Sequence, residues 1–140
     1  MTVYADTSFF VSTYIADNHS TVADTLLRAG SPVWFTSLHY AEWTHAIAQQ
    51  VFRAQMSPSD AHRVHKALAQ DRAAGMWVEA AVSENAFELC AELARRHGPR
   101  LGVRTLDTLH VACALQLKAE QFWTFDERQA KLAKAVGLKG

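Results

Sequence analysis

Four short apolar runs alternate with longer helical segments, and this alternation is the feature that most constrains the fold. The runs are rich in β-branched and aromatic residues, as are strands that are buried on both faces of a sheet. They span residues 2–5, 33–36, 76–82 and 121–125. Strands that alternate with helical connections are typical of α/β domains with a mostly parallel sheet.

The segments between these runs carry apolar residues at helical spacing. The predicted helices cover residues 20–29, 38–55, 58–73, 84–96, 107–117 and 127–135. Pro58 suits the start of a helix, because the N–H that it lacks would have no partner there. The longest irregular stretch, residues 97–104, is too short to separate two domains. We therefore predict one domain over residues 1–140, a three-layer α/β/α fold with a central, mostly parallel sheet flanked by helices.

The composition argues against a membrane protein and predicts a cytoplasmic one. Hydrophobic residues make up 49% of the chain and charged residues 20%, and no apolar run approaches the roughly 18–20 residues needed to span a bilayer. The N-terminus does not resemble a signal peptide, because Asp6 interrupts its apolar stretch. Cys90 and Cys113 lie among apolar residues in helical segments, where we expect buried free thiols.

The formal net charge is zero, so the overall charge of the protein does not indicate nucleic acid as a partner. Basic residues are nevertheless concentrated in two places, the segment ARRHGPRLGVR and the C-terminal end. The first segment contains Arg100 and Arg104 and leads directly into Asp107. Such a local patch can bind phosphates on a neutral protein, or it can be a solvated surface.

Four acidic residues lie at the ends of predicted strands or in largely apolar helices. Asp6 follows the first predicted strand and Asp126 the last, and the carboxyl ends of parallel strands share one edge of a sheet. Glu42 lies in a helix among apolar neighbours, and Asp107 begins a helix that is apolar nearly all round. Each acid also has a structural explanation. Asp6 and Asp126 suit helix N-caps, Asp107 suits the helix dipole, and Glu42 suits a solvated helix face.

Taken together, the four acids predict a site for a divalent cation. Carboxylates about 5 Å apart repel by about 3 kcal/mol per pair at an effective dielectric constant near 20. The chain offers no set of Lys or Arg residues that would match all of them. Such a cluster needs protons or a divalent cation, and hard oxygen ligands favour Mg²⁺ or Mn²⁺. Cations held in this way serve phosphoryl chemistry, because they acidify water and stabilise the leaving oxygen.

The ordered motifs resemble those of the PIN-domain nucleases and, more closely, the VapC toxins of bacterial and archaeal toxin–antitoxin pairs. The motifs are Asp6 in ADTS, Glu42 in SLHYAEW, Asp107 in RTLDTLHVACAL and Asp126 in TFDERQ. The resemblance covers essentially the whole chain. It implies a metal-dependent endoribonuclease in which these four acids are the catalytic metal ligands, bind one or two Mg²⁺ or Mn²⁺ ions, and use a metal-activated water without a covalent enzyme intermediate. Glu127 could share or replace the role of Asp126.

The resemblance also implies partners and helper residues. The substrate would be RNA, commonly transfer RNA or ribosomal RNA, a cognate antitoxin would cover the groove, and the toxin would frequently form a homodimer. By analogy, Thr7 or Ser8, together with Thr124, would hydrogen-bond a carboxylate or a metal-bound water. Arg100 and Arg104 are our candidates for residues that bind the RNA backbone.

Other functions fit parts of the sequence. Glu42-x-x-His45 and Asp107-x-x-His110 have the spacing found in carboxylate-bridged di-iron bundles, although the interleaved strands do not suit a four-helix bundle. An aspartyl-phosphate phosphatase would need a second Asp where this chain has Ser8. A PIN-fold RNA-processing nuclease that is not a toxin, or an RNA- or protein-binding module without catalysis, would share the predicted fold.

Overall fold

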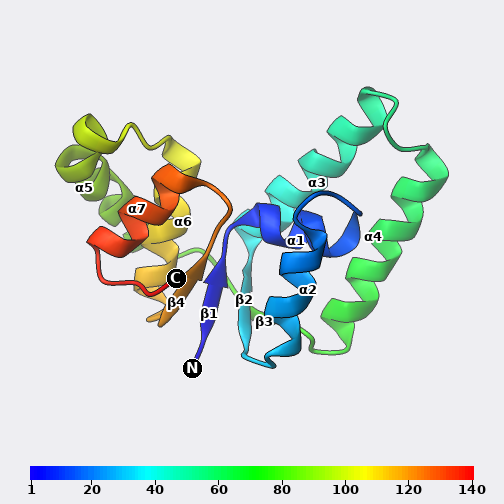
Figure 1. The fold of residues 1–140 in the computed structure, drawn as a ribbon, viewed down its shortest axis with the longest axis horizontal. Coiled ribbons are helices and arrows are strands. Elements are labelled where there is room, and N and C mark those ends of the chain that lie inside the picture. The colour runs from blue at the N-terminus through cyan, green and yellow to red at the C-terminus, as the bar shows by residue number, and fades with distance from the viewer.

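The computed structural model describes residues 1–140 and contains four parallel strands in the order β3-β2-β1-β4 (Figure 1). β1 pairs with β2 on one side and with β4 on the other, and β2 pairs with β3. The strands are β1 (Val3–Ala5), β2 (Val33–Thr36), β3 (Val78–Ala80) and β4 (Gln121–Trp123). The predicted parallel sheet is confirmed, although the third and fourth strands are shorter than the apolar runs that contain them.

Helices connect the strands and cover both faces of the sheet. In chain order they are α1 (Thr7–Tyr14), α2 (Ser20–Arg28), α3 (Ser37–Phe52), α4 (Pro58–Ala73), α5 (Glu84–Leu101), α6 (Thr105–Gln116) and α7 (Glu127–Ala135). In Figure 1, α1 to α4 lie on one side of the sheet and α5 to α7 on the other. The predicted α/β/α layering is therefore confirmed.

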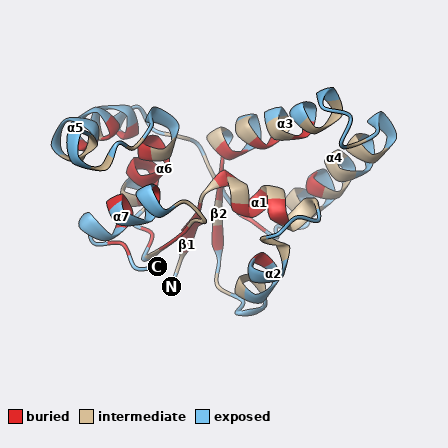
Figure 2. Cartoon of the chain, turned by 45° about the horizontal axis from the view of Figure 1, so that its top comes forward, coloured by how far each residue is buried: buried red, intermediate tan, exposed pale blue.

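The two hydrophobic clusters follow from the two-residue period of the strands. In β1, Val3 and Ala5 join the cluster formed with α1 to α4, whereas Tyr4 points to the opposite face and joins the cluster under α5 to α7. In β4, Trp123 and Phe122 divide in the same way. Figure 2 shows the buried residues along the strands and on the helix faces turned toward them. β1 is thus the central strand of both cores.

The start of α3 is bound tightly to the edge of the sheet. Thr36 ends β2 and is also the N-cap of α3, where its side chain accepts a hydrogen bond from the His39 N–H at 3.3 Å. His39 Nδ1 accepts from the Thr36 N–H at 2.9 Å, and Nε2 donates to the Ala5 carbonyl at 2.7 Å. Burial lowers the pKa of His39 well below its ordinary value, so this connection uses a neutral imidazole. The path of α3, which carries Glu42, is fixed relative to β1.

The prediction that residues 97–104 are irregular is wrong for its first part. α5 continues to Leu101 with Pro99 inside it, and it ends at Gly102, whose φ of 65° places it in the left-handed region. Proline removes the N–H that would serve the carbonyl of Arg95. Both residues are exposed, so water can satisfy that carbonyl. Although α5 has 18 residues, neither it nor any other helix is apolar enough to cross a membrane.

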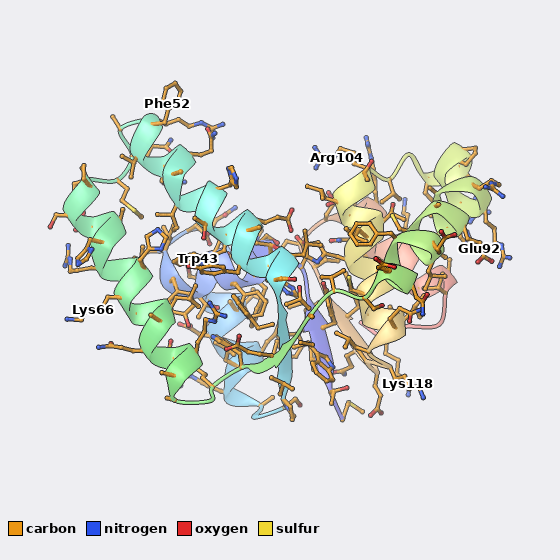
Figure 3. All side chains as sticks on the ribbon, turned by 180° about the vertical axis from the view of Figure 1, so that it is seen from behind. Trp43, Phe52, Lys66, Glu92, Arg104 and Lys118 are labelled. Atoms are coloured by element: carbon orange, nitrogen blue, oxygen red, sulfur yellow. The ribbon has the colours of Figure 1, made fainter.

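The hairpin of α3 and α4 allows a direct test of which apolar side chains stabilise the fold. Leu68 on α4 is 1% exposed, whereas Phe52 at the end of α3 is 85% exposed and projects from the tip of the hairpin (Figure 3). We expect Leu68→Ala to lower the free energy of unfolding by about 2–5 kcal/mol, because it leaves a cavity. Phe52→Ala should change it by less than about 0.5 kcal/mol. Urea denaturation followed by circular dichroism measures both, and equal losses would contradict this packing.

Candidate functional site

The carboxyl edge of the sheet brings together segments that are far apart in the sequence. The chain leaves β1 toward β2, whereas β4 lies on the other side of β1, so this edge contains a topological switch point. Asp6 directly follows β1, and its N–H donates to the carbonyl of Trp123 at the end of β4 at 2.9 Å. Glu42 reaches the same edge on α3. α6 runs back along the sheet to β4, so the first turn of α6, with Asp107, also lies there.

Three of the predicted acids line one open cavity. Its volume is about 320 Å³, and its walls include Asp6, Glu42 and Asp107. Their side chains are only 16%, 26% and 20% exposed, respectively. Carboxylates that are buried to this extent need partners that offset their lost hydration. The partners therefore show what each acid can do.

Asp6 occupies the N-cap position of α1, but its side chain makes no capping hydrogen bond. Its Oδ2 instead accepts from the Ser8 hydroxyl at 2.8 Å, and its Oδ1 lies 3.8 Å from Nε2 of His110. Helix capping therefore does not account for the orientation of this carboxylate. Ser8, which we predicted as a helper residue, contacts an acid of the site.

Glu42 is held by two donors from different elements. Its Oε1 accepts from the Thr7 hydroxyl at 2.7 Å and from Nε2 of His110 in a close contact. Burial raises the pKa of Glu42, but the hydrogen bonds from His110 and Thr7 outweigh burial and leave the pKa below its ordinary value. Glu42 is therefore an anionic carboxylate at neutral pH.

Asp107 shows the opposite shift. Burial raises its pKa, and repulsion from Asp6 and Asp126 raises it further. Arg104 opposes this effect, because its Nε lies 3.4 Å from Oδ2 of Asp107. The Arg104 side chain is 81% exposed, so solvent screens much of this ion pair. The net effect is a carboxylate that the surrounding acids destabilise.

Asp126 stands next to the cavity but is not part of its wall. Its Oδ1 accepts from the backbone N–H of Gln129 at 2.9 Å, so it caps α7. The side chain of Gln129 does not complete a capping box. It accepts from the Thr124 hydroxyl at 2.6 Å and donates to the backbone carbonyl of Asp107 at 3.1 Å. Glu127, the first residue of α7, is exposed.

The remaining predicted residues divide between the site and its surroundings. Thr124 contacts the backbone of Asp126, whose N–H it accepts at 3.0 Å, rather than the carboxylate. Arg104 is the N-cap residue of α6 and reaches Asp107. Arg100 lies in the last turn of α5, where its guanidinium is 3.2 Å from Nδ1 of His97 and contacts none of the acids. Arg104 therefore contacts an acid of the site, whereas Arg100 does not.

His110 is the residue of the site that the sequence analysis named only as part of a di-iron spacing. It is fully buried, and it contacts Glu42, Thr7 and the hydroxyl of Tyr4. The available signal was its position three residues after Asp107, which places both side chains on one face of α6. That signal did not reveal that Tyr4 and Glu42 would be the partners.

The donor set suits a hard divalent cation by its chemistry. No three His, Cys, Asp or Glu side chains stand close enough together to enclose an ion. Asp6, Glu42 and Asp107 nevertheless offer carboxylate oxygens to one cavity, with hydroxyl groups beside them. The pKa of Asp107 is raised first by burial and then by repulsion from Asp6 and Asp126. Carboxylate and hydroxyl oxygens of this kind favour Mg²⁺ or Mn²⁺ over softer ions.

A parallel α/β/α fold with an acidic cavity at the carboxyl edge of its sheet is typical of a recognised class of protein domain. The family model of the PIN domain matches residues 3–135, so the chain belongs to the PIN-domain family. The family predicted from the motifs is confirmed. No curated protein sequence matches the chain.

Solved structures with the same fold extend over nearly the whole chain. VapC20 of Mycobacterium tuberculosis, described as a sarcin-ricin loop cleaving toxin, has a TM-score of 0.71 at 20% identity and covers 97% of this chain and 95% of its own. FitAcB of Neisseria gonorrhoeae has a TM-score of 0.72 at 16% identity, covering 99% and 96%. VapBC2 of Rickettsia felis, bound to a DNA fragment from its promoter, has a TM-score of 0.67 at 15% identity, also covering 99% and 96%. At these identities the similarity shows the fold alone.

The electrostatics of the cavity predict that Asp107→Asn stabilises the folded protein at neutral pH. A raised pKa means that folding disfavours the charged carboxylate. The free energy of unfolding of wild type is therefore reduced at any pH at which Asp107 is ionised. We expect a gain of less than about 1 kcal/mol at pH 7, because solvent screens the site. The gain should vanish below about pH 3, where the acid is protonated in the folded and unfolded states.

Thermal unfolding at pH 7 and at pH 3 measures this difference. Asp24→Asn, which changes an exposed acid on α2, is the matched control. Its unfolding temperature should stay within experimental error of wild type at both pH values. A loss of stability in Asp107→Asn at pH 7 would contradict the repulsion described above.

Proposed function

We propose that the chain is a metal-dependent endoribonuclease and acts as the toxin of a toxin–antitoxin pair. The observation that carries this proposal is the cavity at the carboxyl edge, which three partly buried acids from three separate segments share. Asp6, Glu42 and Asp107 would hold Mg²⁺ or Mn²⁺, and Asp126 would complete the set from the start of α7. When bound, a divalent cation supplies charge neutralisation at the phosphate and acidifies water for the attack on it.

The protein residues have separate roles in this proposal. Ser8 and Thr7 orient the carboxylates of Asp6 and Glu42 through the hydrogen bonds described above. Arg104 stands at the cavity rim beside Asp107 with most of its guanidinium exposed. It would bind the phosphate backbone of the RNA and guide it toward the acids. Gln129 would keep the start of α7 against the first turn of α6, and so keep Asp126 near Asp107.

The proposed toxin role draws on the fold relatives. VapC20 is described as a toxin that cleaves the sarcin-ricin loop, and VapBC2 binds promoter DNA. By analogy, this chain would cleave transfer or ribosomal RNA, would be covered by a cognate antitoxin, and would form a homodimer. Its location in the cytoplasm stays a prediction.

Purified protein incubated with total RNA tests the catalytic proposal. We expect cleavage with Mn²⁺ or Mg²⁺ and none with EDTA. Asp6→Asn should lower the cleavage rate by about 100-fold or more, because it removes one charged ligand without changing the size of the side chain. Asp24→Asn should cleave as wild type does. Fragment yield on denaturing gels measures the rates.

Two outcomes would change the assignment. Equal cleavage by Asp6→Asn and wild type would contradict the catalytic role of the acids. Binding of RNA without any cleavage in the presence of either cation would favour a binding module with the PIN fold. Glu127→Gln, assayed beside Asp126→Asn, decides which of these neighbouring acids the reaction uses. We expect the loss in Asp126→Asn, since Asp126 adds to the field at Asp107.

The basic residues beside the site predict a change in the salt dependence of RNA binding. In an Asp6→Asn background, Arg100→Gln with Arg104→Gln should weaken binding. It should also flatten the plot of log affinity against log salt by about 0.7 for each phosphate that the protein no longer neutralises. Lys66→Gln with Lys118→Gln is the control, because those residues lie on α4 and beyond the opposite end of α6 (Figure 3). Filter binding from 50 to 200 mM salt measures the slopes, and an unchanged slope in the arginine variant would refute this role.

A further inference from the structure

A buried chain of hydrogen bonds runs beneath the cavity from β1 to α3. Tyr4 and His110 are both fully buried, and the Tyr4 hydroxyl lies 2.6 Å from Nδ1 of His110. The other ring nitrogen, Nε2, contacts Oε1 of Glu42 and lies 3.1 Å from the Thr7 hydroxyl and 3.8 Å from Oδ1 of Asp6. Nε2 of His110 thus lies close to two of the acids in the cavity, Glu42 and Asp6.

The chemistry of Glu42 sets the direction of its bond to His110. A carboxylate can only accept, so Nε2 of His110 donates to Glu42. Nδ1 is hydrogen-bonded to the Tyr4 hydroxyl. Both ring nitrogens are occupied, and no lone pair of the imidazole remains for an ion. His110 is therefore placed to orient a ligand and not to be one.

We propose that His110 is a positioning residue that holds the Glu42 carboxylate facing Asp6, so that the two acids can bind one divalent cation together. This inference rests on the proposed function, because it concerns the same site. An imidazole suits the task, since its ring is rigid and its anchored N–H fixes the direction of the carboxylate.

The fold supports this role from three directions. Tyr4 is on the central strand β1, His110 is on the buried helix α6, and Glu42 is on α3, whose start is fixed to β1 through His39. Glutamate has several rotatable bonds, so its carboxylate loses a defined position when its donors are removed. With Thr7 as its only donor, Glu42 would keep a single hydrogen bond, from the neighbouring helix α1. Hydrogen bonds of this kind to metal ligands typically change metal affinity by about 10–100-fold.

The dissociation constant of Mn²⁺, measured by electron paramagnetic resonance of the free ion, tests this role without an activity assay. His110→Leu should weaken Mn²⁺ binding by about 10–100-fold. His110→Gln, whose amide N–H can reach the position of Nε2, should recover most of the affinity. Tyr4→Phe, which removes the anchor of the ring, should give a smaller loss than His110→Leu. His62→Leu changes an exposed histidine on α4 and should bind Mn²⁺ as wild type does.

His110→Asn keeps the experiment decisive if His110→Leu does not fold. Its shorter amide is polar but does not reach Glu42, so it should bind Mn²⁺ as weakly as expected for His110→Leu. Wild-type affinity in His110→Asn would overturn the proposal, and so would a His110→Gln variant that binds as weakly as His110→Asn, because packing alone would then explain the loss.

The same preparations separate this inference from the proposed function. Wild type that binds Mn²⁺ with the expected His110 dependence but leaves RNA intact would overturn the nuclease and keep the positioning role. Wild type that cleaves RNA while His110→Asn retains full Mn²⁺ affinity would keep the nuclease and overturn the positioning role. Wild type that binds no Mn²⁺ would overturn the positioning role, and cleavage of RNA with Mg²⁺ would then test the nuclease separately.

Discussion

Repulsion between like charges at the carboxyl edge of the sheet is the constraint on which the rest of the site depends. The surrounding side chains hold the acids with hydrogen bonds: Ser8 donates to Asp6, and Thr7 and His110 donate to Glu42. Buried cations would stabilise the fold more directly, but they would also remove the negative charge. The site keeps that charge at a cost in stability, as functional sites often do. This arrangement suits a cavity that binds a cation.

The fold could be predicted from the sequence because its signals are local and agree with one another. Each strand is a short apolar run, and every helix except α1 carries helical spacing of its own. α1 (Thr7–Tyr14) was not predicted. The end of α5 could not be predicted in the same way. Gly98 and Pro99 are helix-breaking signals, yet the helix continues to Leu101 because the affected turn is exposed to water. Exposure is a property of the tertiary structure, and no local pattern reports it.

The sequence predicted that the acids of the site lie at the carboxyl edge of the sheet, but it did not predict their contacts. Asp6 and Asp126 both follow a strand and both precede a helix, so their local sequences indicate capping equally well. Only Asp126 caps its helix; Asp6 accepts from Ser8 instead. The role of His110 was hidden for a similar reason. Its contact with Tyr4 joins residues 106 positions apart, and a histidine on an apolar helix gives no sign of such a partner.

The opposite pKa shifts of Glu42 and Asp107 make the cavity electrically asymmetric. Hydrogen bonds lower the pKa of Glu42, whereas burial and neighbouring acids raise that of Asp107. Glu42 is therefore harder to protonate than an ordinary glutamate, whereas Asp107 is easier to protonate than an ordinary aspartate. One side of the cavity keeps its charge through hydrogen bonds from His110 and Thr7, and the other side can relieve repulsion by taking up a proton. Such a division lets several acids share one cavity without a bound ion, because they need not all be ionised together.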